Sequence, residues 1–185
     1  MSLSTKKENR ISKFLSLVLR HKPETIGIEL DASGWVNVDT LLVQMKANGM
    51  PVEKPELEQV VANNAKQRFS FNTDQTKIRA NQGHSISVEL GLPPTEPPEI
   101  LYHGSAAKNF DSIVSSGLLK GSRQHVHLSA DIETAAQVGQ RHGKPIVFQV
   151  DAGAMHKTGI LFFKSDNGVW LTEYVPKQYL STLND

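Results

Sequence analysis

The stretch LGLPPTEPPE, residues 90–99, decides how the chain is organised. It holds four prolines within six residues, and proline neither extends a helix nor donates a hydrogen bond in a central strand. This stretch is the one strong break in composition along the chain. We therefore predict two lobes, residues 1–90 and 100–185, joined by a proline-rich linker at residues 91–99.

The composition is that of a folded, water-soluble chain. Its 185 residues are 38% hydrophobic and 21% charged, far from the values of a disordered chain. No stretch approaches the roughly 20 apolar residues of a membrane-spanning helix, and residues 1–10 contain no hydrophobic signal core. The absence of cysteine excludes disulfides, thiolate metal sites and a cysteine nucleophile. We expect a cytoplasmic monomer with no membrane partner.

Positive and negative charges are nearly balanced. The formal net charge of the chain is +1, so we expect no extended positive surface that could bind nucleic-acid duplexes along their length. Recognition of a nucleic acid would therefore have to depend on a few clustered cations.

The first lobe has the pattern of three helices followed by a β-hairpin. The first helix has one apolar face, and Pro23 prevents it from extending further. The second begins with Asp39 as its N-cap and ends near Gly49, and the third begins at Pro55. Short apolar runs predict a strand at residues 26–30 and a hairpin within residues 69–80. This order of elements is typical of a winged helix-turn-helix lobe.

The second lobe alternates short apolar runs with helical patterns. Such alternation predicts an α+β lobe around a small mixed β-sheet. The lobe has no glycine-rich dinucleotide fingerprint, so a nucleotide would need another binding mode. The expected strands are residues 100–102, 126–128, 146–150 and 169–171, and the expected helices are residues 109–116 and 132–141.

Cationic side chains are placed where they could bind phosphate. Arg20 and His21 lie at the end of the first helix, where cations often serve only to oppose the helix dipole. A guanidinium group can also bind two phosphate oxygens while a histidine donates to a third. Arg68 opens the hairpin, although a lone arginine on a strand is usually solvated. The run RANQGHS, residues 79–85, contains a glycine at which backbone can approach a ligand closely.

Histidines and glycines lie near strand ends in the second lobe. His103 precedes Gly104, a pair that offers a side chain and free backbone groups to a ligand. His125 and His127 lie on one strand face at a spacing that permits zinc, but the chain lacks cysteine and an HExxH motif. We therefore expect no metal. Arg141 lies in a basic turn that ordinary helix termination explains equally well.

These pieces together resemble the RNA 2'-phosphotransferase family over nearly the whole chain. Any one motif could occur by chance, but eight of them occur in register. Ser105 stands where threonine is common in the family, an exchange that keeps the hydroxyl group. The eight motifs are LSLVLRHKP, LDASGWVNVDTLL, KQRFSF, IRANQGHS, LYHGS, HVHLSAD, RHGKPIVF and NGVWLT.

The resemblance implies a winged-helix, RNA-binding N-lobe and an NAD-binding C-lobe of the ADP-ribosyltransferase type. It implies a transferase that uses NAD as co-substrate and acts on RNA with an internal 2'-phosphate, as at a tRNA splice junction. Both lobes would contribute catalytic residues, namely Arg20, His21, Arg68 and Arg141. The residues implied in NAD binding are His103, Gly104, Ser105, His127, Leu128, Ser129 and Val169.

The same resemblance implies a reaction in two steps. The RNA 2'-phosphate first attacks the ribose carbon that bears nicotinamide, which gives 2'-phospho-ADP-ribosylated RNA and nicotinamide. The adjacent ribose hydroxyl then attacks phosphorus, which gives RNA with a 2'-hydroxyl and ADP-ribose 1'',2''-cyclic phosphate. Arg20, His21 and Arg68 would position the phosphate in the first step. Arg141 would stabilise the charge that develops in the second.

Two other functions stay open at this point. One is a one-step ADP-ribosyltransferase that acts on nucleic-acid phosphate ends. The other is a winged-helix DNA-binding regulator that senses NAD. The regulator predicts a basic recognition helix, but neither candidate helix, at residues 40–48 or 56–64, is basic.

Overall fold

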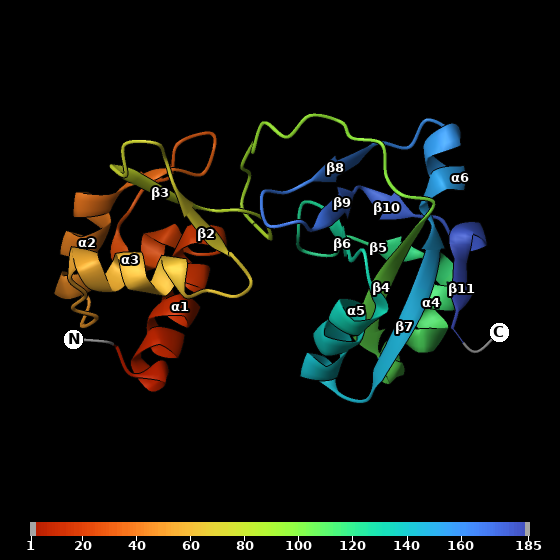
Figure 1. Ribbon diagram of the computed structural model, residues 1–185, viewed down its shortest axis with the longest axis horizontal. Helices are drawn as coiled ribbons and strands as arrows, with labels where there is room; N and C mark the ends of the chain where they lie inside the picture. The colour runs from red at the N-terminus through yellow and green to blue at the C-terminus, as the bar shows by residue number, and fades with distance from the viewer. Residues whose placement is uncertain (1–2, 184–185) are drawn as a thin grey trace. The chain divides into compact units, whose positions relative to one another are not determined.

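The computed structural model describes residues 3–183, except for the side chain of His142 (Figure 1). The chain divides into two compact units, Met1–Gly91 and Leu92–Asp185. The division falls at the start of the proline-rich stretch. Each unit has its own cluster of buried hydrophobic side chains, which is the basic requirement of a domain.

The first unit contains three α-helices, and the three predicted helices are confirmed. Ser4 and Asn37 cap the first two of them, because each side chain accepts a hydrogen bond from a main-chain N–H of the first turn. The second helix was expected to have Asp39 as its cap, but it begins earlier, directly after Asn37. The helices are α1 (Thr5–Arg20), α2 (Val38–Ala47) and α3 (Lys54–Ala62).

A three-stranded antiparallel sheet completes the first unit. Its order is β1-β3-β2, and the predicted hairpin between β2 and β3 is confirmed. The strand predicted at residues 26–30 is wrong, because Pro23 opens a short 3-10 helix, η1 (Pro23–Ile26), and Gly27 ends it with φ at +67°. The strands are β1 (Val36–Asn37), β2 (Phe69–Phe71) and β3 (Lys77–Ala80).

The second unit contains small sheets in which every strand pair that the structure describes is antiparallel. The α+β class is therefore confirmed, and the expectation of a mixed sheet is wrong. The sheet orders are β11-β7-β4, β6-β9-β8 and β10-β5. The strands are β4 (Ile100–Ala106), β5 (Leu118–Leu119), β6 (Val126–Leu128), β7 (Pro145–Asp151), β8 (Phe162–Lys164), β9 (Trp170–Thr172), β10 (Tyr174–Val175) and β11 (Leu180–Thr182).

Short helices connect these strands. The helix expected to reach Arg141 is α-helical only as far as Gly139 and then tightens into a 3-10 turn. The helices are α4 (Phe110–Ser116), α5 (Ile132–Gly139) and α6 (Ala152–Lys157), with 3-10 turns η2 (Ala107–Asn109), η3 (Gln140–His142) and η4 (Lys177–Tyr179).

The proline-rich stretch packs along β8. Thr95 donates its main-chain N–H to the carbonyl of Phe162 at 2.8 Å, and Pro94 forms a bridge with Phe163. A proline cannot make the first of these contacts because it has no N–H. Thr95 therefore supplies the donor that ties this stretch to the second unit.

Two glycines allow α5 to lie directly against β4, as Figure 1 shows for the two elements. A β-carbon added at Gly104 would lie 1.6 Å from the carbonyl oxygen of Ala135. One added at Gly139 would lie 2.6 Å from the carbonyl oxygen of Ser105. Both distances are far shorter than a van der Waals contact, so the close approach of α5 and β4 requires glycine at both positions.

We expect Gly139→Ala to destabilise the second unit by about 1–3 kcal/mol, because the added methyl group would push α5 away from β4. The exposed neighbour Gln140 gives the matched control, Gln140→Ala, which should have little effect. Amide hydrogen exchange of β4 and α5 measures the local loss directly. Equal protection in the two variants would show that the close approach does not matter for stability.

His84 is a buried polar side chain in the first unit, with 1% of its surface exposed. Neither of its ring nitrogens has a hydrogen-bond partner among the residues that the structure describes. Burial, followed by the positive charges of Arg20, His21 and Arg79, lowers the pKa of His84 from 6.5 to about 4. The imidazole is therefore neutral in the folded protein at neutral pH.

This low pKa predicts that the protein is less stable in weak acid. The folded pKa lies below the unfolded value, so the unfolded chain binds the extra proton between pH 6.5 and about 4. The free energy of unfolding should be fully retained above pH 6.5, and should be about 2 kcal/mol lower at pH 5 than at pH 7.5. Urea unfolding at the two pH values measures the difference.

Two variants isolate the contribution of His84 to this pH dependence. His84→Leu and His84→Met remove the titrating group and replace a side chain that makes no hydrogen bond in the described residues. Between pH 7.5 and pH 5, the free energy of unfolding of both variants should fall by about 2 kcal/mol less than that of the wild type. The assignment to His84 is wrong if wild type and both variants lose the same amount.

Candidate active site

Arg20 and Arg68 lie together in the first unit. Arg20 is the last residue of α1, and its Nη2 donates to the main-chain carbonyl of Arg68 at 3.4 Å. Its guanidinium group also lies over the ring of Phe69, 5.8 Å from the centroid. Arg68 in turn donates from Nη1 to the side-chain oxygen of Asn64 at 3.3 Å. The end of α1 thus places the guanidinium group of Arg20 against the backbone of Arg68, just before β2 begins.

His21 and Ser85 make a second contact at the same end of α1. The distance between His21 Nδ1 and the Ser85 hydroxyl oxygen is 2.9 Å. The main-chain N–H of Ser85 donates to the carbonyl of Arg20, also at 2.9 Å. Asn81 joins this loop to the hairpin, because its main-chain N–H donates to the carbonyl of Arg68. The sequence motif RANQGHS, whose role was open, therefore links Arg20, His21 and Arg68.

A pair of histidines lies in the second unit, where β4 meets the end of β6. Tyr102 and Ser129 form an antiparallel bridge, with main-chain hydrogen bonds of 2.9 and 2.8 Å. This bridge brings His103 Nδ1 to 2.9 Å from the carbonyl oxygen of His127. Because a carbonyl can only accept, Nδ1 of His103 carries the proton.

The electrostatic environment keeps His103 neutral. Burial lowers the pKa of His103 most strongly, the hydrogen bond to the carbonyl of His127 opposes this, and the charge of Arg123 lowers the pKa further. With the proton on Nδ1, the Nε2 atom of the neutral ring holds a lone pair. His103 can therefore accept a hydrogen bond from a hydroxyl group such as that of a ribose.

Because it contacts His127, Arg123 is a candidate site residue, one that the sequence did not suggest. Its Nη1 lies 3.1 Å from His127 Nδ1, and because a guanidinium only donates, Nδ1 of His127 accepts. The proton of the neutral His127 ring is therefore on Nε2. Burial and the nearby charge of Arg141 both lower the pKa of Arg123, so the two guanidinium groups lie close enough to repel each other. The position of Arg123 just before the HVHLSAD motif was the only signal in the sequence.

The other residues expected to bind NAD differ in how far their side chains are exposed. Ser105 is buried, and its hydroxyl accepts a hydrogen bond from Asn109. Leu128 is 1% exposed, so its side chain belongs to the core and only its backbone could meet a ligand. Val169 is partly exposed, and its main-chain N–H donates to the hydroxyl of Ser165.

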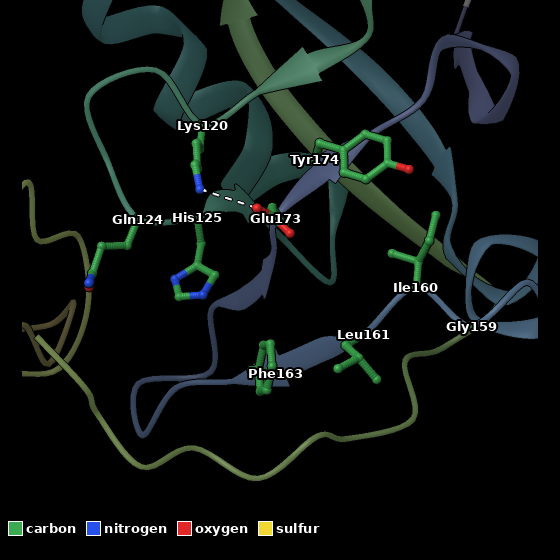
Figure 2. Close-up of a pocket in the computed structure, with 9 residues that line it drawn as sticks. All are labelled: Lys120, Gln124, His125, Gly159, Ile160, Leu161, Phe163, Glu173 and Tyr174. Atoms are coloured by element: carbon green, nitrogen blue, oxygen red, sulfur yellow. Dashed lines mark hydrogen bonds and ion pairs between the residues drawn. The ribbon is translucent and has the colours of Figure 1, made fainter. Parts of the chain in front are cut away.

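A pocket of about 450 Å³ lies on the second unit, as Figure 2 shows. His125 and Phe163 lie 5.8 Å apart between ring centroids, and Lys120 is paired with Glu173 at 3.4 Å. Burial lowers the pKa of His125, and the charge of Lys120 lowers it further. None of the seven residues expected to bind NAD lines this pocket. The lining residues are Lys120, Gln124, His125, Gly159, Ile160, Leu161, Phe163, Glu173 and Tyr174.

Among the side chains that the structure describes, which exclude that of His142, no three histidine, aspartate or glutamate residues are grouped so that they could hold a metal ion. No helix within residues 3–183 is long and apolar enough to cross a bilayer. His125 and His127, which the sequence placed at a spacing suitable for zinc, contact Phe163 and Arg123 respectively.

Comparison with known proteins places the chain in one family. Residues 6–174 match the family model described as RNA 2'-phosphotransferase, Tpt1 / KptA family. A protein of Trichormus variabilis named "Probable RNA 2'-phosphotransferase" is 57% identical over 175 residues, which cover 95% of this chain and 96% of that protein.

Two further relatives are also named "Probable RNA 2'-phosphotransferase". The protein of Hahella chejuensis is 52% identical over 179 residues, covering 97% of this chain and 96% of its own. The protein of Streptomyces coelicolor is 50% identical over 171 residues, which cover 92% of this chain and 93% of that protein. The chain belongs to the RNA 2'-phosphotransferase family.

Proposed function

We propose that this protein is a transferase that removes an internal 2'-phosphate from RNA and uses NAD as the acceptor of the phosphate. The observation that carries the proposal is the contact of Arg20 with Arg68 and of His21 with Ser85 at the end of α1. Guanidinium and imidazole groups gathered at one place suit a phosphate monoester, which has close to two negative charges at neutral pH. We further propose that the first unit is a winged-helix lobe and the second an ADP-ribosyltransferase-like lobe.

In the proposed first step, Arg20, His21 and Arg68 hold the 2'-phosphate. A phosphate oxygen forms a bond to C1'' of the nicotinamide ribose, and the bond from that carbon to the nicotinamide nitrogen breaks. Nicotinamide leaves with the electron pair of the broken bond and loses its positive charge. The dianion needs no general base, so the apolar side chain of Val169 is compatible with this step.

The second unit offers suitable groups for NAD. Nε2 of His103 can accept a hydrogen bond from a ribose hydroxyl, and Nε2 of His127 can donate one to an oxygen. The backbone of Gly104 could bind the carboxamide, and Ser129 could contact a ribose. Ser105 and Leu128 would contribute through their backbone, because the hydroxyl of one is bonded to Asn109 and the side chain of the other is in the core.

In the proposed second step, the neighbouring 2'' hydroxyl of the ADP-ribose attacks phosphorus. The bond from phosphorus to the RNA 2'-oxygen breaks, and that oxygen takes up the proton lost by the hydroxyl. The products are RNA with a 2'-hydroxyl and ADP-ribose 1'',2''-cyclic phosphate. Arg141 and its neighbour Arg123 would stabilise the negative charge that accumulates on the phosphoryl oxygens.

The direct test is incubation of the protein with NAD and an RNA oligonucleotide that has one internal 2'-phosphate. Mass spectrometry should show loss of the phosphate and formation of the cyclic phosphate, with one NAD consumed for each phosphate removed. A matched oligonucleotide with a 2'-hydroxyl should leave NAD unchanged. A reaction that stops at ADP-ribosylated RNA would contradict the second step, and phosphate loss without NAD would contradict the role of NAD.

Variants of Arg123 and Arg141 should separate the two steps. We expect Arg123→Ala and Arg141→Ala to slow the second step by roughly 100-fold or more, so that ADP-ribosylated RNA accumulates. Arg68→Ala should instead slow formation of that intermediate, because it weakens the hold on the 2'-phosphate. Rapid-quench measurement of both species distinguishes the cases. If only one of the two second-unit variants accumulates the intermediate, the other arginine has no part in that step.

A further inference from the structure

Ser85 makes two contacts with the end of α1. Its main-chain N–H donates to the carbonyl of Arg20 at 2.9 Å, and its hydroxyl oxygen lies 2.9 Å from Nδ1 of His21. One residue therefore contacts two neighbouring residues of the proposed phosphate cluster, through its backbone and through its side chain.

The backbone of His21 is held by the helix itself. Its N–H donates to the carbonyl of Leu17, as expected for the residue that caps the C-terminal end of α1. The helix thus fixes the backbone of His21, and Ser85 contacts its ring.

The loop that carries Ser85 is anchored at both ends. At its start, the main-chain N–H of Asn81 donates to the carbonyl of Arg68 at 2.9 Å, and the Asn81 side chain donates to the carbonyl of Gln67 at 2.6 Å. Just before Ser85, the ring of His84 is buried in the first unit. The hydroxyl of Ser85 is consequently held at a fixed place although the residue itself is exposed.

We propose that Ser85 is a positioning residue that orients the imidazole of His21 so that its Nε2 faces the RNA 2'-phosphate. This inference rests on the proposed function, because it assigns His21 to phosphate binding. It adds a residue for which the sequence and the family comparison gave no role.

The chemistry of a hydroxyl group suits this task. A serine hydroxyl donates to Nδ1 of a neutral imidazole and accepts from the Nδ1–H of a protonated one. The contact therefore survives a change in the charge of His21, and the ring keeps its orientation in both states. When the hydroxyl donates to Nδ1, the proton of neutral His21 is on Nε2, where it can be donated to a phosphoryl oxygen.

Three variants first test the proposal through the rate of the first step, measured in single turnovers at saturating NAD. Ser85→Ala should slow the formation of ADP-ribosylated RNA by roughly ten-fold, the usual effect of one lost hydrogen bond. Ser85→Thr keeps the hydroxyl and should stay within about two-fold of the wild type. Ser87→Ala, at an exposed serine two residues along the loop, should leave the rate unchanged.

The decisive comparison is the effect of Ser85→Ala when His21 is absent. If Ser85 acts through His21, adding Ser85→Ala to His21→Ala should change the residual rate by less than about two-fold. If Ser85 merely supports the loop, the same substitution should cost as much in the His21→Ala background as in the wild type. That second result would overturn the proposal.

A readout that does not depend on turnover is the ¹⁵N chemical shift of His21 Nδ1 in the full-length protein with labelled histidine. Loss of the hydroxyl in Ser85→Ala should move this shift, while Ser87→Ala should leave it in place. If the wild type does not process 2'-phosphorylated RNA at all, the proposed function fails, and the shift then decides alone whether Ser85 orients His21. An unchanged shift in Ser85→Ala overturns the inference even if the enzyme is active.

Discussion

The candidate site in each unit depends on arginine side chains that lie within electrostatic range of other basic groups. Like charges at close range raise the free energy of the folded state unless other contacts compensate. In the first unit, Arg20 donates to a main-chain carbonyl and lies over Phe69, and Arg79 lies 4.5 Å from the ring centroid of Trp35. Carbonyl groups and aromatic rings stabilise a cation without neutralising it. These contacts therefore help to hold the arginine side chains in place.

The secondary structure of the first unit could be read from the sequence because its signals are local. Pro23 prevents α1 from extending further. The N-cap side chains of Ser4 and Asn37 each accept a hydrogen bond from a main-chain N–H three residues later. The wrong strand at residues 26–30 has a local cause too. Apolar Ile26 and Ile28 fit a strand pattern, but Pro23 and Gly27 set backbone angles that favour a tight turn, and both isoleucines are buried without pairing.

The candidate site was less accessible to sequence reasoning, because its contacts join residues far apart through the main chain. Nothing in the letters around Ser85 indicates that its N–H meets the carbonyl of Arg20, or that Asn81 meets Arg68. Arg123 was missed for a similar reason, since a single arginine before a strand has no spacing pattern. Its partner His127 becomes evident only when β6 has folded and its strand face is defined. The sequence motifs identified most of the candidate residues, but only the structure shows which of them contact one another.

In the proposed reaction, the charge on the phosphoryl group gives a reason for two separate groups of arginines. The 2'-phosphate enters as a monoester with close to two negative charges and becomes a diester with one after the first bond forms. Arg20, His21 and Arg68 would therefore bind the substrate more strongly than the intermediate. Negative charge rises again on the phosphoryl oxygens when the ribose hydroxyl attacks, and stabilisation is then needed in that transition state rather than in the bound intermediate. Arg123 and Arg141, which repel each other when no anion is bound, would be relieved of that repulsion as the charge develops.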